Sequence, residues 1–544
     1  MRTIPTLMMI GCFGMAQAQM SGVYTVGPAG AIPAPDYTSL AAACSALMQT
    51  GVSGAVDIEI MDGTYTETIT LGTVPGVSAT NRIKITSQSG SKSAVTFAVD
   101  CRLPGSFRIN CPYVLVTDLT IHQLTYGAAN TNSGVFLGAD HLLLKDCEVE
   151  CLDCGVNYWS GLVGAQGGNI RIKGNTLLGN GGATHGITVT DSSDPEILEN
   201  EIVECQWGVS ATYGNDVVTV LDNTIRECNY GIRIQGGSDH VVARNHLYGA
   251  SLTAGIQVSN SDGDDLHVDI NNNMISVRRM APIYTGTIAG ISIIPAANSA
   301  PTGLLSGRIS HNSMVCSSDQ QNVSGIHVRM TSANGLSLLS NSIKLMGTGM
   351  VGIDLVDSLC QVWPASDHNN VYRMGAGNMF GIFATHDQIA AQTGMEAHSI
   401  SANPWYFSNT DLHIKDMSAN INRALVDLSL SVDFDKDPRQ YYDIPYDIGA
   451  DEHGDLGLKS VVEMEPSLLA VEEFRAYPNP ADDHVLLEPR PHGGVEVFST
   501  TGQRIAVLSV EGMGVALGEL PNGTYILRWT SDEGGHAVPI VVRH

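Results

Sequence analysis

An internal repeat limits the fold of this sequence more than any other feature. One half of the repeat is Gly followed by Val or Ile, as in Gly208-Val209 and Gly231-Ile232. The other half is Asn, any residue and an aliphatic residue, and its asparagines are Asn175, Asn200, Asn223, Asn245, Asn273, Asn312 and Asn341. Their separations run from 22 residues (Asn223 to Asn245) to 39 residues (Asn273 to Asn312). A unit of this size cannot bury a core alone, so neighbouring units are expected to stack.

Apolar and polar residues alternate inside a unit, as in Gly231-Ile232-Arg233-Ile234, which is the period of a β-strand. About three short strands fit in each unit, and the Asn-Gly signals of hairpins are missing between its halves. If each coil stacks on the next at about 4.8 Å, every strand pairs in parallel with its equivalent. We expect the repeated Asn to adopt the left-handed conformation at a bend and to stack its amide along the axis, and the repeated Gly to permit a sharp turn where a Cβ would clash.

This repeat resembles the right-handed parallel β-helix superfamily of pectate-lyase-like proteins, and so do the segments that flank it. A short amphipathic helix is expected from residue 36 to 43, and Asp433-Phe434-Asp435 and Asp447-Ile448-Gly449 lie in a candidate closing segment. The resemblance covers residues 20–452 and implies an all-β solenoid with capped ends. Since this fold serves unrelated activities, it does not define a function.

After Glu452 the repeat stops, and residues 453–471 are expected to form a linker. Residues 472–544 contain Tyr477-Pro478-Asn479-Pro480 and Leu520-Pro521-Asn522-Gly523, with strand patterns that predict a small antiparallel β-sandwich. This order of motifs resembles the type A sorting domain of the type IX secretion system of Bacteroidetes. The resemblance implies export across the outer membrane, with the secretion machinery as a partner.

Residues 1–19 carry Arg2, an apolar stretch and then small residues, which is typical of a secretory signal peptide. No later segment is apolar enough to predict a transmembrane anchor. Asp and Glu number 55 against 28 Lys and Arg, a formal charge of −27 that disfavours nucleic acid as a partner. We therefore expect an extracellular protein, either released or attached to the outer cell surface.

The cysteines of the exported chain would be able to form disulfides. Cys205 and Cys228 occupy the same position in adjacent units, so their Cα atoms should lie about 4.8 Å apart, within the range for a disulfide. A ladder of free, stacked thiols fits the same register. The group of Cys147, Cys151 and Cys154 favours a structural use over metal binding, because no fourth ligand is near in sequence.

No complete catalytic set is recognisable. Gly263-Asp264-Asp265 and Arg171-Ile172-Lys173 resemble pieces of the polygalacturonase signature, but they occur in the reverse order. Asp262, Asp264 and Asp265 form a candidate calcium site, since this cation prefers oxygen ligands in a flexible loop. Asp433, Asp435 and Asp437 offer similar chemistry, but the closing segment accounts for them without a metal.

Two pairs of aromatic residues suggest sugar binding. Trp207 and Tyr230 share a repeat position, but strand parity places them on the inward face with Ile232, which favours a buried ladder. Tyr158 and Trp159 lie in a less regular segment and are candidate substrate-binding residues. We expect a carbohydrate-directed protein that binds or degrades an extracellular polysaccharide, as a lyase or hydrolase if it is an enzyme. The alternative is a noncatalytic adhesin or structural surface rod.

Overall fold

Two compact units, Met1–His453 and Gly454–His544, make up this computed structural model. No helix in its described part is long and apolar enough to cross a membrane. Between residues 19 and 454 the structure describes all residues apart from 101–106, 125–132, 153–160, 182–183, 250–251, 261–264, 280–287, 296–304, 319–321, 330–334, 356–363, 428 and 440–444. In the second unit it describes residues 475–477, 484–488, 494–499, 504–511, 514–518, 520–531 and 534–543.

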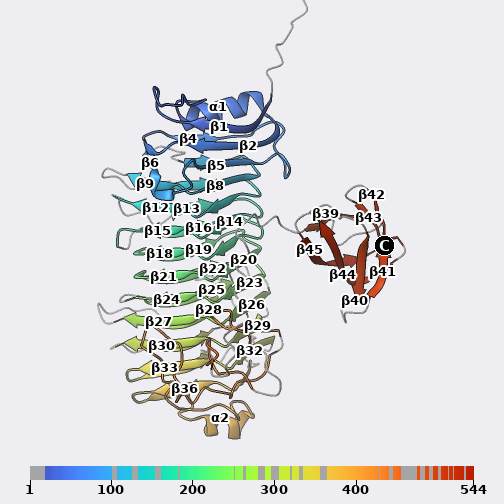
Figure 1. Ribbon diagram of the computed structural model, residues 1–544. Coiled ribbons are helices and arrows are strands. Elements are labelled where there is room, and N and C mark those ends of the chain that lie inside the picture. The colour runs from blue at the N-terminus through green and yellow to red at the C-terminus, as the bar shows by residue number, and fades with distance from the viewer. Residues whose placement is uncertain are drawn as a thin grey trace, which may run out of the picture. The chain divides into compact units, whose positions relative to one another are not determined.

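The first unit is a right-handed parallel β-helix, as the sequence predicts. Its strands form three parallel sheets, here named A, B and C, and the chain visits them in that order in each coil. Figure 1 shows the coils stacked between α1 at one end and α2 at the other. Each strand pairs with its equivalent one coil away, as Ile197 of sheet A does with Val220.

Sheet A has 13 described strands: β1 (Met20–Val26), β2 (Val52–Ile60), β5 (Ile83–Ser87), β8 (Val114–Thr117), β11 (Leu143–Lys145), β14 (Arg171–Lys173), β17 (Glu196–Leu198), β20 (Val217–Leu221), β23 (Asp239–Ala243), β26 (Leu266–Asn271), β29 (Leu305–Ser310), β32 (Gly335–Leu339) and β35 (Ala365–Asp367). Sheet B has 12 described strands: β3 (Gly63–Tyr65), β6 (Val95–Asp100), β9 (Thr120–Leu124), β12 (Glu148–Cys151), β15 (Thr176–Leu178), β18 (Glu201–Val203), β21 (Thr224–Arg226), β24 (His246–Tyr248), β27 (Met274–Arg279), β30 (Ser313–Ser318), β33 (Ser342–Met346) and β36 (Asn370–Arg373).

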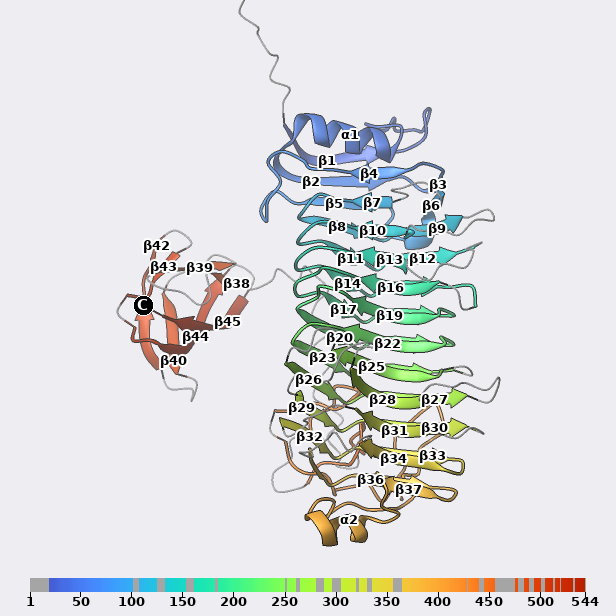
Figure 2. The ribbon, with the colours of Figure 1, turned by 180° about the vertical axis from the view of Figure 1, so that it is seen from behind.

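Sheet C also has 12 described strands: β4 (Ile69–Leu71), β7 (Phe107–Ile109), β10 (Val135–Leu137), β13 (Gly161–Ala165), β16 (His185–Val189), β19 (Trp207–Thr212), β22 (Tyr230–Gln235), β25 (Ala254–Asn260), β28 (Ile288–Pro295), β31 (Val323–Val328), β34 (Met350–Leu355) and β37 (Gly377–Phe380). The view from behind in Figure 2 shows these strands one above another. The inward side chains of the three sheets share one apolar core, in which Ile202, Ile225 and Ile232 are fully buried.

The seven predicted asparagines form a buried ladder between sheets A and B, and Asn369 continues it. The Nδ2 of each Asn donates to the Oδ1 of the next, at 2.9 to 3.1 Å. The same Nδ2 also donates to a carbonyl of sheet A, as Asn223 does to Ile197 at 2.8 Å. The predicted stacking of amides along the axis is therefore confirmed.

The predicted backbone conformation of these asparagines is wrong by one position. The residue before each Asn has the positive φ, for example Asp222 at 59° and His311 at 53°. That residue turns the chain from sheet A into sheet B, and the Asn side chain then satisfies backbone groups at the bend. The repeated Gly acts through space rather than through its φ: a Cβ on Gly255 would lie 2.4 Å from the carbonyl oxygen of Gly290.

Helices cover both ends of the β-helix. At the N-terminal end lies α1 (Leu40–Thr50), which begins four residues after the predicted start at residue 36. Its Leu40 and Leu47 side chains are fully buried. The short helix η1 (Lys92–Ala94) precedes β6, and α2 (His386–Thr393) follows the last coil with a capping box at Thr385. Residues 397–453, here called the closing segment, then return over the coils at the lower end in Figure 1.

The second unit is a small antiparallel β-sandwich, as predicted. One sheet has the order β38 (Arg475–Tyr477), β39 (His484–Glu488), β43 (Gly514–Ala516) and β42 (Val510–Glu511). The other has the order β41 (Arg504–Leu508), β40 (Val495–Ser499), β44 (Gly523–Ser531) and β45 (Gly534–Val542). Val485 and Val515 of the first sheet share a core with Leu527 and Trp529 of the second.

Candidate functional site

Charged side chains pair with one another on the outward face of sheet A and at the bend that follows it. Arg244 contacts Asp222 at 2.7 Å and Arg308 contacts Asp269 at 2.6 Å. Arg171 pairs with Glu196, while Lys173 lies 3.4 Å from Glu199, so the Arg171-Ile172-Lys173 fragment belongs to this ladder of ion pairs. Such pairs stabilise neighbouring coils modestly and leave little unmatched charge for a ligand.

The outward face of sheet C has a different character. Trp207 of β19 and Tyr230 of β22 are partly buried and stack with ring centroids 4.4 Å apart and an interplanar angle of 15°. They face outward because Gly208 and Val209 both face inward: a Cβ on Gly208 would lie 2.5 Å from the Cγ2 of buried Ile225. The predicted inward orientation of this aromatic pair is therefore wrong, since strict alternation breaks at the glycine.

A cation lies beside this aromatic pair. The guanidinium carbon of Arg233 is 5.6 Å from the centroid of the Trp207 ring, and its Nη2 donates to the Oε1 of Gln235 at 2.7 Å. Burial lowers the pKa of Arg233 from its ordinary value, but an arginine remains charged under physiological conditions. Its side chain is thus a partly desolvated cation held against an aromatic face.

His185 occupies the position of Trp207 one coil earlier, because Ile187 pairs with Val209. Burial, together with the charge of Arg233, lowers the pKa of His185 to about 4, so the imidazole is neutral at pH 7. Its Nδ1 is buried and has no hydrogen-bond partner among the described residues, like the Oγ1 of Thr184. Unpaired buried polar atoms are costly and often mark a place where a ligand or water binds. We call His185, Trp207, Tyr230 and Arg233 the sheet C site.

A second polar group lies further along sheet C. The Nδ1 of His327 is 3.3 Å from the Oδ2 of Asp354, and the hydroxyl of Ser324 donates to the same oxygen at 3.5 Å. Both side chains thus contact the carboxylate, whereas a nucleophilic serine needs its hydrogen bond to the histidine. This arrangement does not support nucleophilic catalysis.

Several predicted site residues cannot be placed. Tyr158, Trp159, Asp262 and Asp264 lie outside the described residues, so the structure does not test them as sugar or calcium ligands. Asp265 is exposed just before β26.

Cys205 and Cys228 are free thiols, so the candidate disulfide between them is not formed. The backbone N–H of Cys205 contacts the sulfur of Cys228 at 3.4 Å, and each thiol donates to a carbonyl two residues earlier in its own coil. Stacked thiols in the core are therefore the correct alternative. Cys147 is also free and buried, whereas Cys151 is disulfide-bonded.

Asp433 is the aspartate of the closing segment with a clear structural role. Asp433 is fully buried, and one of its oxygens accepts hydrogen bonds from the backbone N–H groups of Asp435 and Asp437 at 2.9 and 2.8 Å. Burial raises the pKa of Asp433 to about 7. Arg439, which is also buried, pairs with Glu452 and donates to Asn272 of the β-helix. Asp433 thus orders the turn of the closing segment, and the pair of Arg439 and Glu452 fastens that segment to the β-helix.

Three groups of described side chains have ligand atoms close enough to hold a metal ion. One contains His413, Asp435 and Asp451. Hydrogen bonds with Asp435 and Asp411 raise the pKa of His413 to about 9, so both of its ring nitrogens carry protons. In another, His122, Glu148 and Glu150 lie beside Lys92, whose Nζ donates to Thr176 on the neighbouring coil. The third contains Asp367, His368 and His398.

Sequence reasoning did not find Arg233, His185 or this third group. Arg233 was visible as the one charged residue in Gly231-Ile232-Arg233-Ile234, where alternation predicts an outward side chain. The pairing of His398 with Asp367 had no local signal, because the two residues meet only through the fold.

The fold and the site define a parallel β-helix protein with a polar and aromatic outward face. The family model for the right-handed β-helix region matches residues 85–247 and 160–361, together just over half of the chain, so the chain belongs to this family. Among curated proteins, no sequence matches.

Solved structures with a similar fold include the catalytic domain of a GH87 alpha-1,3-glucanase in complex with tetrasaccharides, at 14% identity and a TM-score of 0.35, covering 71% of this chain and 70% of that one. A PL6 alginate lyase in complex with a trisaccharide has 12% identity and a TM-score of 0.32, covering 63% and 85%. The rice weevil pectin methyl esterase has 11% identity and a TM-score of 0.20, covering 69% and 92%. At these values the likeness supports no conclusion about this protein.

Proposed function

We propose that this protein binds an extracellular polysaccharide along the outward face of sheet C. The observation that carries the proposal is the stacked, outward pair of Trp207 and Tyr230 with Arg233 beside it. Aromatic rings give sugar rings an apolar surface, while a guanidinium offers several N–H donors in a fixed geometry. Equivalent positions recur about every 4.8 Å along the axis, so an extended glycan chain can follow the sheet across several coils.

The chemistry of the site favours an acidic glycan. Arg233 supplies a partly buried positive charge on a protein of net charge −27. A guanidinium pairs well with a sugar carboxylate through two parallel hydrogen bonds. We propose binding rather than catalysis as the activity of this site, because its described residues include no carboxylate pair at the aromatic platform.

The binding test uses the full mature chain and a panel of pectin, alginate, chondroitin and a neutral glucan, measured by affinity electrophoresis and calorimetry. Trp207→Ala and Arg233→Gln should each weaken binding to the acidic glycans by more than about tenfold. Trp405→Ala is the matched control, because this tryptophan is 46% exposed on the closing segment, away from sheet C. Equal binding by wild type and both site variants, or no binding to any glycan, would contradict the proposal. Release of new reducing ends by wild type but not by Trp207→Ala would contradict the choice of binding over catalysis at this site.

We also propose that the protein is exported by type IX secretion, with residues 1–19 as the signal peptide and residues 472–544 as the sorting domain. The C-terminal sandwich and the motif order around Tyr477-Pro478-Asn479-Pro480 support this route. Removal of residues 472–544 in a bacterium with this system should leave the β-helix inside the cell envelope. Undiminished appearance of the truncated chain in the medium would refute the route.

A further inference from the structure

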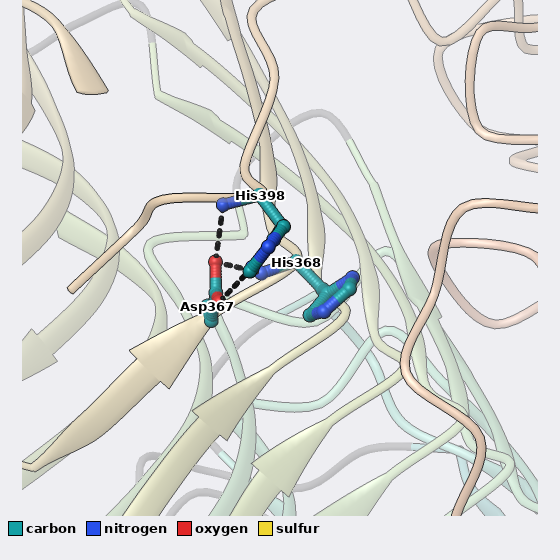
Figure 3. Close-up of side chains that lie close together, drawn as sticks. All are labelled: Asp367, His368 and His398. Carbon is teal, nitrogen blue, oxygen red and sulfur yellow. Dashed lines mark hydrogen bonds and ion pairs between the residues drawn. The ribbon is translucent and has the colours of Figure 1, made fainter. Parts of the chain in front are cut away.

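Asp367, His368 and His398 come together at the last coil of the β-helix (Figure 3). Asp367 is the final residue of β35, and His368 follows it with a φ of 56°. His398 lies in the closing segment, after α2. Both oxygens of Asp367 hold this arrangement: Oδ1 accepts from the backbone N–H of His368 at 2.9 Å and of His398 at 2.8 Å, and Oδ2 lies 2.7 Å from the Nδ1 of His398.

The two imidazole rings lie side by side. Their centroids are 5.0 Å apart and the rings are nearly parallel, at 16°. One ligand atom from each of the three residues lies within 4.8 Å of the others. The side chain of His398 is 68% exposed, so a small rotation of this ring brings a nitrogen closer to the other two ligands. Metal–nitrogen bonds of about 2.1 Å require such a contraction.

The two rings present different nitrogens to a metal ion. The Nδ1 of His368 lies 3.1 Å from the carbonyl oxygen of Arg423, and the Nδ1 of His398 faces a carboxylate oxygen. The carbonyl of Arg423 only accepts, so neutral His368 carries its proton on Nδ1 and its lone pair on Nε2, whereas an ion bound by Asp367 would replace the proton between Oδ2 and the Nδ1 of His398. A hydrogen bond from one ring nitrogen to a carbonyl or carboxylate is the usual way in which proteins orient a metal-binding histidine.

We propose that Asp367, His368 and His398 bind a divalent transition-metal ion, for which Zn²⁺ is the natural probe. Two imidazoles and one carboxylate suit zinc and its neighbours, whereas calcium prefers a shell made of oxygen ligands. The His398 side chain is 68% exposed, so water can supply a further ligand. The other two groups fit less well, since both nitrogens of His413 are engaged by carboxylates and Lys92 lies beside Glu148.

A metal ion here would join separate parts of the chain. Asp367 and His368 belong to the last coil, His398 to the start of the closing segment, and the Nδ1 of His368 reaches the carbonyl of Arg423 in its middle. The ion would therefore fasten the C-terminal cap to the coils beneath it. An ion that binds only the folded state raises stability in proportion to the logarithm of its concentration.

The experiment uses the full mature chain, stripped of metal and titrated with Zn²⁺ by calorimetry, with metal content after dialysis and thermal unfolding as further readouts. We expect one tightly bound Zn²⁺ and a rise in the melting temperature, with no such effect from Ca²⁺. His398→Ala and His368→Ala should each weaken zinc binding by more than about tenfold and abolish the rise.

His453→Ala is the matched control, because His453 pairs with Asp416 at 2.9 Å but belongs to no described three-ligand group. It should keep wild-type zinc binding. His398 is exposed, so His398→Ala should fold, which the melting curve without metal verifies. Failure of wild type to bind zinc, or equal zinc binding by wild type and His398→Ala, would overturn the proposal. None of these outcomes depends on sugar binding by sheet C.

Discussion

Replacement of Asn223 by alanine should destabilise the β-helix strongly. The Asn223 side chain is buried, accepts hydrogen bonds from the N–H and Nδ2 of Asn200 at 2.9 and 3.0 Å, and donates to the carbonyl of Ile197 and to the Oδ1 of Asn245. Alanine makes none of these bonds. The N–H of Asn200 and the two acceptors are then left buried in the core.

Each such unsatisfied group costs about 1–3 kcal/mol, and partial relaxation reduces the sum, so we expect a loss of about 3–6 kcal/mol. This is at the upper end of what single substitutions do. Urea unfolding followed by circular dichroism measures the loss, and hydrogen exchange should show faster opening of the coils around Asn223. Asn409→Ala is the control, since Asn409 is exposed and accepts one hydrogen bond, from Lys344 at 3.4 Å. A loss below about 1 kcal/mol for Asn223→Ala would refute the structural role of the ladder.

Three further predictions concern other parts of the β-helix. Gly255→Ala should cost at least about 2 kcal/mol in urea unfolding, because its Cβ would lie 2.4 Å from the oxygen of Gly290, while Gly54→Ala, with one contact at 3.2 Å, should be nearly neutral. Hydrogen bonds to Asp435 and Asp411 raise the pKa of His413 to about 9, so its contribution to stability is complete below pH 6.5 and is lost as the pH rises through 9. The melting temperature of wild type should therefore fall over this pH range, and His413→Gln should reduce the fall. Cys205 and Cys228 should resist a thiol reagent in the native protein and react with it after unfolding without reductant. If they formed a disulfide, they would stay unreactive until reduced.

The fold could be predicted because its evidence is periodic. Asn175 to Asn341 recur at matching positions, and one Asn in each coil is enough to set the register of all three sheets. The left-handed position before each Asn could not be recognised, because Glu199, Asp222, Arg244 and Ser340 share no chemistry. The stacking of the coils, and not the residue type, sets the backbone conformation at this position.

The candidate site was harder to predict for two physical reasons. The orientation of Trp207 depends on Gly208, which faces inward although its neighbour Val209 also does. The alternation of inward and outward side chains is therefore shifted by one residue for Trp207. The meeting of Asp367 with His398 depends on the path of the chain around α2, which no sequence period encodes. Local patterns thus predict coils well and surfaces poorly, since surfaces combine residues from different coils.

The asparagine ladder has a direction, and this direction affects how the protein can change in length. Every amide from Asn175 onward donates to the following coil, so a whole coil inserted between two ladder positions would find both its acceptor and its donor already in place. The ends differ: the ladder begins at the N–H of Cys147 and stops where Asn369 donates to Ser399 and Glu396 near the C-terminal cap. The number of coils is therefore free to vary in the interior, while the two terminating arrangements must be kept.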